Sequence, residues 1–225
     1  MFDPKEFVDD AIKKLREEIK GKALIACSGG VDSTVAAVLA YKAIGEKLYA
    51  LHVNTGLLRK NESNQVRNLF QRLGIHLDYI DASERCFEKL KGIKDPEEKR
   101  KIIGELFIRI FEEFAEEKDI EYLIQGTIAP DWIESGDQLR DTIKTHHNVG
   151  GLPKDIKLKV VEPLRDLYKD EVRKVARFLD IPNSLTTEPS DSERGCKNRK
   201  PMFIRSICSR SIISRLPLLL IEDGI

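Results

Sequence analysis

The sequence predicts an α/β protein in which a parallel five-stranded sheet is flanked by helices. Short apolar runs alternate along the chain with segments of helical periodicity, as stacked strand–helix–strand crossovers require. The first of these runs, at 22–27, is apolar after its initial lysine, which is typical of a strand buried on both faces. With 225 residues, 41 % of them hydrophobic and 34 % charged, the chain is long enough to bury a sizeable core.

The N-terminal half is expected to open with an amphipathic helix. Val8, Ile12, Leu15 and Ile19 share one helical face, and Gly21 ends the helix. The elements expected after it are a strand at 22–27, a helix at 34–44, a strand at 48–53, a helix at 61–73 and a strand at 77–80.

The C-terminal half is expected to add one long helix and to complete the sheet. Ile103, Phe107, Ile110 and Phe114 recur at helical spacing and are predicted to face the core. The expected elements are a helix at 97–118, strands at 121–125 and 157–161, and a helix at 170–179 that ends before Pro182.

Two stretches break this alternation and define the predicted domain organisation. Residues 126–156 are polar and glycine-bearing without a clear period, and so long an insert in a compact domain is usually functional. From Thr186 onward, serine and arginine become frequent and no amphipathic pattern is visible. We expect one domain over 1–185, with the insert inside it, and an atypical tail over 186–225.

Charge and cysteine content exclude several classes of partner. Lys+Arg and Asp+Glu number 38 each, so no basic excess favours nucleic acid or a membrane surface. The cysteines at 27, 86, 196 and 208 have neither metal-ligand nor disulfide-framework spacing. The charged N-terminal segment is unlike a signal peptide, and no apolar run approaches the about 20 residues of a bilayer span. We expect a cytoplasmic protein with reduced thiols and without a membrane or nucleic-acid partner.

The turn after the first strand carries the most specific chemical signal. Its sequence is Ser28-Gly29-Gly30-Val31-Asp32-Ser33, between a strand and a helix, where backbone N–H groups and the helix dipole favour an anion. The glycines allow close approach to phosphate oxygens. Asp32 suits such a site if it holds a cation such as Mg²⁺. No lysine follows as in a kinase-type loop, so a bound pyrophosphate is predicted; a capped turn without ligand is the structural alternative.

In this context SGGVDS resembles the PP-loop of the ATP pyrophosphatases, which cleave ATP between the α- and β-phosphates and leave an adenylated substrate. Other motifs resemble the synthetase domain of the GMP synthase family. The most discriminating is IKTHHNVGGLP at 143–153, because other PP-loop families share the first loop but not this stretch. The remaining motifs are GLLR at 56–59, KRKIIG at 99–104, QGTI at 125–128, PD at 130–131, IES at 133–135, EPL at 162–164 and KDEVR at 169–173. The resemblance implies an adenine-nucleotide alpha hydrolase-like fold.

The resemblance also implies a reaction, the ATP-driven amination of xanthosine monophosphate (XMP). The xanthine O2 would attack the α-phosphorus, pyrophosphate would leave, and ammonia would displace AMP to give GMP. Residues 28–33 would cradle the pyrophosphate, and Asp32 and Glu134 would hold Mg²⁺. Without the family, Glu134 is better explained as a solvated loop acid.

Three further roles follow from the resemblance at strand ends. Val53 or its neighbours would line the adenine and ribose where the second strand ends. Gly126 would allow close approach of the nucleotide after the fourth strand; a simple strand-end turn is its alternative. Asp131 would orient the substrate, or would be a turn residue after Pro130.

The insert would form a mobile lid that closes over ATP and XMP and excludes water. Its Lys144, His146 and His147 would meet phosphate charge or the adenylated intermediate. The residues alone favour surface loop positions, because two adjacent histidines without further ligands at metal spacing make a poor zinc site.

The resemblance bears on partners as well. GMP synthases continue into a C-terminal domain that forms a homodimer and completes the XMP site, and residues 186–225 do not align with it. That domain is expected to be missing. No cysteine–histidine glutaminase domain is present in the sequence, so ammonia is expected from solution or from a separate glutamine amidotransferase subunit.

Two other functions stay open. One keeps the PP-loop and changes the acceptor, as in NAD synthesis or tRNA thiolation; the balanced charge and the cysteine positions argue against thiolation. The other is a nucleotide-binding form without full activity, because of the missing domain.

Overall fold

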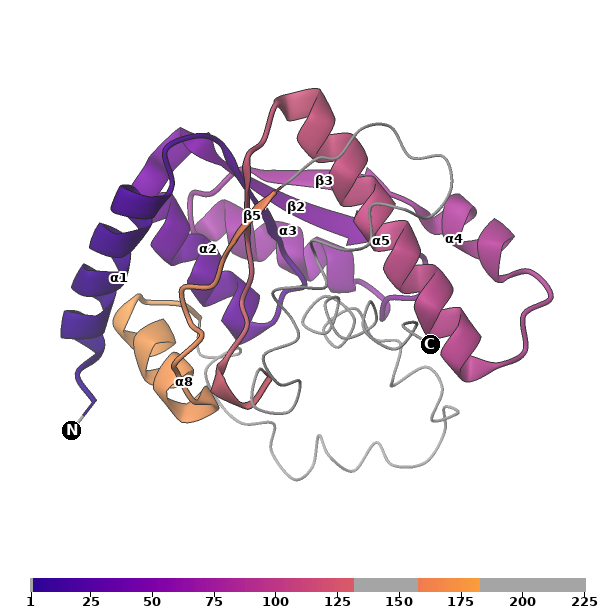
Figure 1. Ribbon diagram of the computed structural model, residues 1–225. Helices are drawn as coiled ribbons and strands as arrows, with labels where there is room; N and C mark the ends of the chain where they lie inside the picture. Colours follow the sequence, from indigo (N-terminus) through magenta and orange to yellow (C-terminus); the bar gives the residue numbers. More distant parts are fainter. Residues whose placement is uncertain (1, 132–157, 183–225) are drawn as a thin grey trace, which may run out of the picture.

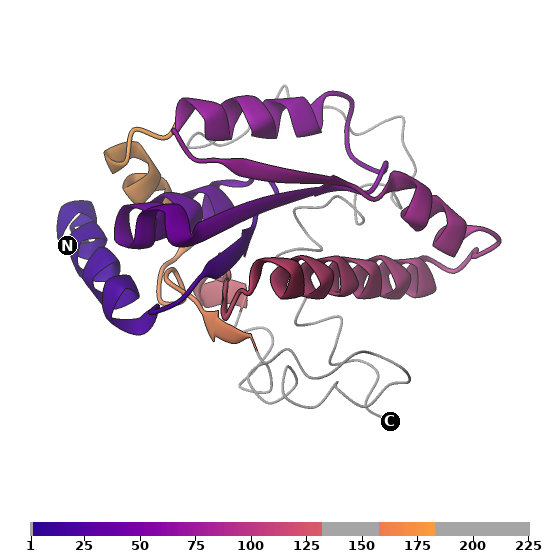
Figure 2. The ribbon, with the colours of Figure 1, turned by 90° about the horizontal axis from the view of Figure 1, so that it is seen from above.

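Three layers make up the computed structural model, which describes residues 2–131 and 158–182 (Figures 1 and 2). The middle layer is a parallel sheet of five strands in the order β3-β2-β1-β4-β5. The strands are β1 (Ala23–Ala26), β2 (Leu48–Asn54), β3 (Leu77–Asp81), β4 (Tyr122–Ile124) and β5 (Lys159–Val161). The predicted fold class and all five predicted strands are confirmed.

Helices cover both faces of the sheet. One core cluster joins α1, α2, α3 and α8 to one face, and a second joins α4 and α5 to the other; Figure 2 shows α3 and α5 on opposite sides of the strands. The helices are α1 (Pro4–Glu18), α2 (Val31–Ile44), α3 (Glu62–Arg72), α4 (Ser83–Leu90), α5 (Pro96–Lys118) and α8 (Lys169–Phe178), with a short 3₁₀ turn η1 (Gly45–Lys47) after α2.

The helix starts follow from local chemistry. Asp3 and Asp95 cap α1 and α5 by accepting backbone N–H bonds, and a proline follows each of them at the first helical position. At α8, the carboxylate of Glu171 accepts a bond from the N–H of Tyr168 at 2.9 Å. A structural role for Glu171 is what its place at a helix N-terminus predicts.

Two elements differ from the prediction. Helix α4 was not expected, because within its eight residues only Cys86 is buried and so short a segment shows little periodicity. Helix α2 begins at Val31 rather than at 34, since Gly30 is its N-cap and Gly30 O accepts the N–H of Thr34 at 3.1 Å. Three of the six loop residues, 31–33, therefore form the first turn of the helix.

The strand order places a switch point in the middle of the sheet. From β1 the chain winds outward to β2 and β3 on one side, and it later returns to add β4 and β5 on the other. In open α/β sheets, ligands bind at the carboxyl ends of the strands where the winding reverses. The segments that follow β1 and β4 meet at this place.

Among the described residues, no helix combines the length and the apolar character needed to cross a bilayer. The predicted boundary at 185/186, the tail and most of the insert (132–156) lie outside the described residues.

Candidate functional site

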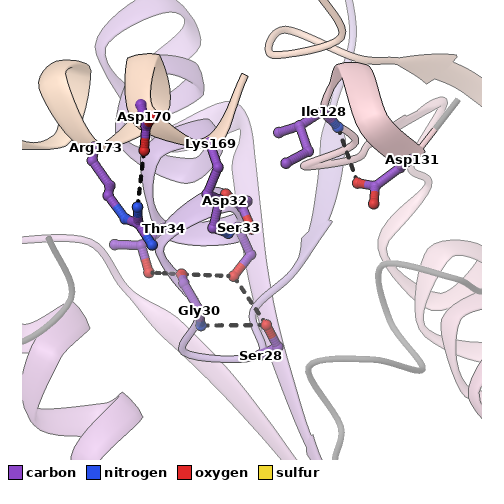
Figure 3. Close-up of polar contacts among 10 residues, drawn as sticks. All are labelled: Ser28, Gly30, Asp32, Ser33, Thr34, Ile128, Asp131, Lys169, Asp170 and Arg173. Carbon is purple, nitrogen blue, oxygen red and sulfur yellow. Dashed lines mark hydrogen bonds and ion pairs between the residues drawn. The ribbon is translucent and has the colours of Figure 1, made fainter. Parts of the chain in front are cut away.

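A small network of hydrogen bonds shapes the loop between β1 and α2 (Figure 3). The Oγ atoms of Ser28 and Ser33 lie 3.2 Å apart, and the Gly30 N–H points to Ser28 Oγ at 3.4 Å. The carbonyl of Gly30 accepts bonds from the hydroxyls of Ser33 and Thr34, at 3.2 and 2.7 Å. The loop is therefore ordered without a ligand, and its residues end at the N-terminus of α2, where the helix dipole favours an anion.

The fold requires glycine at only one of the two glycine positions of the loop. Gly29 has φ +74°, and a Cβ there would lie 2.6 Å from Cγ2 of Val66 in α3. Gly30 has φ −79°, which any residue adopts, and a Cβ there would meet only Ser28 Oγ, at 3.4 Å. The fold demands glycine at 29 but tolerates a side chain at 30.

Asp32 projects from the first turn of α2 toward the N-terminus of α8. Its Oδ2 forms an ion pair with the ammonium of Lys169, which reaches it from the first position of α8 (Figure 3). Its Oδ1 is enclosed and has no hydrogen-bond partner among the described residues. The carboxylate is thus half paired, with one buried oxygen still able to accept.

Lys169 is the site residue that sequence reasoning missed. It lies in the KDEVR motif, directly before the start of the helix predicted at 170–179. A lysine at the first position of a helix opposes the helix dipole, and this mismatch is the signal that could have marked Lys169 as serving another purpose.

One of the two predicted magnesium ligands, Asp32, lies within the described residues. The unpartnered carboxylate oxygen of Asp32 is a hard ligand of the kind that Mg²⁺ binds. Within 2–131 and 158–182 no group of three His, Cys, Asp or Glu side chains is placed to hold a metal ion. The second predicted ligand, Glu134, lies outside the described residues.

Gly126 follows β4 and packs directly on the start of α2. A Cβ at this position would lie 3.0 Å from the backbone N of Ser33 and 3.1 Å from the carbonyl carbon of Asp32. These are backbone atoms and cannot rotate away. The absence of a side chain at 126 therefore lets the segment after β4 lie against the loop, and the close approach of a nucleotide at Gly126 stays a prediction.

We expect Gly126→Ala to displace the start of α2 and to slow the pyrophosphate release predicted from the sequence about tenfold, with a stability loss of about 1–3 kcal/mol from overpacking. The rate of ATP-dependent pyrophosphate release and the thermal midpoint measure the two effects. Gly74→Ala is the matched control, because Gly74 has φ +68° and nothing within 4 Å of its Cβ position; it should lose stability and keep the rate. Equal rates in both variants would contradict the prediction.

Two other predicted residues lie on neighbouring strand ends. The carboxylate of Asp131 accepts the N–H of Ile128 at 3.1 Å (Figure 3), as in the turn alternative. Val53 is 2 % exposed and belongs to the core on the α4–α5 face, so its side chain is enclosed by protein. Val31 is also buried, and its side chain packs into the other cluster. The ligand contacts predicted for these three residues stay predictions.

The described part of the chain brings together residues 28–33, Gly126 and Lys169. The predicted lid residues Lys144, His146 and His147 lie outside it. Their roles, like those of the residues in contact with ligand, stay predictions.

The two described cysteines are unreactive core residues. Cys27 and Cys86 are 0 % and 1 % exposed. Burial raises the pKa of both thiols, that of Cys86 to about 11, so both are protonated near neutral pH and are poor nucleophiles.

Comparison with known proteins gives one family and close relatives. The family model described as NAD synthase matches residues 4–127. Over 182 residues the chain is 59 % identical to a subunit of the glutamine-hydrolysing GMP synthase of Pyrococcus abyssi, a match that covers 80 % of this chain and 58 % of that protein. It is 58 % identical over 187 residues to the same subunit of the Methanopyrus kandleri enzyme, covering 82 % of this chain and 58 % of that protein. The chain thus spans less than two thirds of the length of these relatives.

A solved structure supports the fold. The NMN synthetase of Francisella tularensis superposes with a TM-score of 0.64 at 18 % sequence identity, covering all of this chain (100 %) and 95 % of that one. At this level of identity the likeness concerns the fold alone.

Proposed function

Because the chain belongs to the NAD synthase family of PP-loop proteins, we propose that it is the ATP pyrophosphatase part of a GMP synthase. It would activate XMP with ATP and aminate it to GMP, with release of AMP and pyrophosphate. The observation that carries this proposal is the high identity with the GMP synthase subunits of two archaea. The geometry of the loop supports its first half, the binding of a departing pyrophosphate.

In the proposed reaction, the β- and γ-phosphates of ATP bind at the N-terminus of α2. The loop's backbone N–H groups are the donors fixed in place, and the hydroxyls of Ser28 and Ser33 hold the loop in this shape by hydrogen bonds within it. As the xanthine O2 bonds to the α-phosphorus, the bond to the β-phosphate oxygen breaks and negative charge grows on the leaving pyrophosphate. Donors fixed at that position stabilise the transition state more than the ground state.

Asp32 and Lys169 would help to neutralise the negative charge of the bound phosphates. Asp32 would hold Mg²⁺ through its unpartnered oxygen, together with Glu134. When bound, the metal neutralises phosphate charge. Lys169 balances Asp32 in the structure without ligand and brings a second positive charge to the edge of the phosphate site.

The second half of the reaction needs ammonia and a closed site. Ammonia adds to C2 of the adenylated XMP. The bond between C2 and O2 then breaks, and O2 leaves as part of AMP. We propose that ammonia comes from a separate glutamine amidotransferase protein, because the relatives are named as one subunit of a glutamine-hydrolysing enzyme. Lys144, His146 and His147 would close over the intermediate and exclude water.

The product assay tests the proposal. The full chain is incubated with ATP, Mg²⁺, XMP and ammonium, and nucleotides and phosphates are separated by anion-exchange chromatography. We expect AMP, pyrophosphate and GMP in equal amounts, dependent on XMP. Formation of ADP, or of AMP without GMP, would contradict the proposal.

Two further arms separate the alternatives. Replacing XMP with a nicotinate nucleotide tests the acceptor that the names of the family model and the structural neighbour suggest. If the chain aminates that nucleotide and does not aminate XMP, the nicotinate nucleotide is the substrate. Replacing ammonium with glutamine should stop turnover unless a second protein is added, and glutamine use by this chain alone would contradict the separate donor.

A further inference from the structure

A buried histidine lies next to the loop and has no role in the site as described. His52 is in β2 and is 1 % exposed. Its Nδ1 lies 2.7 Å from the carbonyl oxygen of Cys27, and its Nε2 lies 3.1 Å from the hydroxyl of Ser63. Because a carbonyl can only accept, Nδ1 carries the ring proton, and in the neutral ring Nε2 accepts from Ser63. Burial lowers the pKa of His52, which favours the neutral ring.

Strand β2 holds both backbone polar groups of Cys27, the residue that connects β1 to the loop. The N–H of Cys27 donates to the carbonyl oxygen of Leu51 at 2.8 Å, and its carbonyl accepts from His52. Since a peptide group is planar, a fixed Cys27 carbonyl also fixes the direction of the Ser28 N–H. His52 therefore sets the orientation in which the chain enters the loop.

The other nitrogen of His52 ties helix α3 to the same place. Ser63 is in the first turn of α3, and Val66, three residues later, lies against Gly29 of the loop. The imidazole thus joins the two structures that border the loop, strand β2 and helix α3.

The ring is itself held in a fixed position. It stacks on its strand neighbour Tyr79, with ring centroids 6.1 Å apart, and the guanidinium of Arg67 lies 3.8 Å from the centre of the Tyr79 ring. Glu62, 4 % exposed, is the acidic group whose charge acts on His52; its carboxylate accepts the N–H of Arg59 at 2.9 Å. These ring contacts account for the position of the imidazole but not for its two nitrogens, which make the hydrogen bonds to Cys27 and Ser63.

We propose that His52 is a positioning residue for pyrophosphate binding: its Nδ1–H holds the Cys27 carbonyl, and through it the Ser28 N–H, in the orientation that the phosphates require. The inference rests on the proposed function, because it takes the loop as the pyrophosphate site. His52 acts through Cys27 and does not itself touch the substrate.

A matched pair of amides tests this role. The amide nitrogen of His52→Asn takes about the place of Nδ1 and keeps a donor for Cys27, whereas that of His52→Gln takes about the place of Nε2 and keeps only the contact with Ser63. Both variants lose the stacking on Tyr79, so a purely structural role would affect them alike. We expect His52→Gln to weaken binding of Mg²⁺-pyrophosphate about tenfold, as for one lost hydrogen bond, and His52→Asn to stay within about threefold of wild type.

Binding is measured by calorimetry with inorganic pyrophosphate and Mg²⁺ on the full chain, and folding by circular dichroism. In turnover, His52→Gln should raise the KM for ATP and leave kcat closer to wild type. If His52→Gln does not fold, His52→Leu takes its place, since leucine is close to histidine in volume and has no donor.

The outcomes separate the two proposals. Equal affinities in the Asn and Gln variants, or wild-type affinity in a folded variant without the donor, would overturn the role of His52 alone. Absence of pyrophosphate binding in the wild type would overturn the proposed function, and the role of His52 with it.

Discussion

Asp32→Asn should lower the rate of ATP-dependent pyrophosphate release about 100-fold or more, as expected when the group that stabilises transition-state charge is lost. The amide has the shape of the carboxylate but carries no charge to attract a cation. The side chain is 24 % exposed, so the fold should persist. Release is followed with a pyrophosphate-coupled assay over a range of Mg²⁺ concentrations.

Asp170→Asn is the matched control, because Asp170 is the acid next to Lys169 in α8. Its side chain is 83 % exposed and pairs with Arg173 at 3.0 Å, and surface ion pairs of this kind contribute about 0–1 kcal/mol. The control should keep the wild-type rate. A folded Asp32→Asn protein that releases pyrophosphate within about threefold of wild type would rule out the proposed role of Asp32.

Gly29→Ala and Gly30→Ala should fail in different ways. At position 29 the alanine meets both a left-handed backbone and Val66, so we expect a stability loss of about 2 kcal/mol or more. At position 30 the backbone is compatible with alanine, and the stability change should stay within about 1 kcal/mol. If phosphates approach the loop closely, Gly30→Ala should nonetheless weaken pyrophosphate binding about tenfold or more.

Thermal unfolding and calorimetry with Mg²⁺-pyrophosphate measure the two effects separately. The double variant Gly29→Ala/Val66→Ala should recover the part of the stability loss that comes from the contact of the two side chains, although Val66→Ala itself creates a cavity. Equal stability losses at positions 29 and 30, or tight binding by Gly30→Ala, would contradict this division of roles.

The sheet and the loop could be predicted because their signals are local. The strands are short apolar runs, and residues 28–33 combine glycines, hydroxyls and a carboxylate at the junction of a strand and a helix. Helix α4 was missed because only Cys86 of its eight residues is buried. A segment that contributes one side chain to the core shows no period from which to predict a helix.

The contacts that complete the site could not be predicted, because they join distant parts of the chain. Lys169 pairs with Asp32 across 137 residues, and Gly126 touches the backbone of Asp32 and Ser33. No pattern in one sequence shows which lysine meets which carboxylate. The resemblance to GMP synthases marked the motifs around these residues but not the contacts between them.

The pair formed by Asp32 and Lys169 sets an order of events during synthesis on the ribosome. Asp32 emerges early, and its counter-charge arrives only with α8, the helix that also packs on α1 and α2. Until then a nascent chain exposes the apolar surface that α8 covers, the kind of surface that promotes aggregation. A polypeptide cut short before residue 169 would therefore lack the counter-charge of Asp32 and part of its core together, so the loop at 28–33 reaches its final state only after α8 has been made.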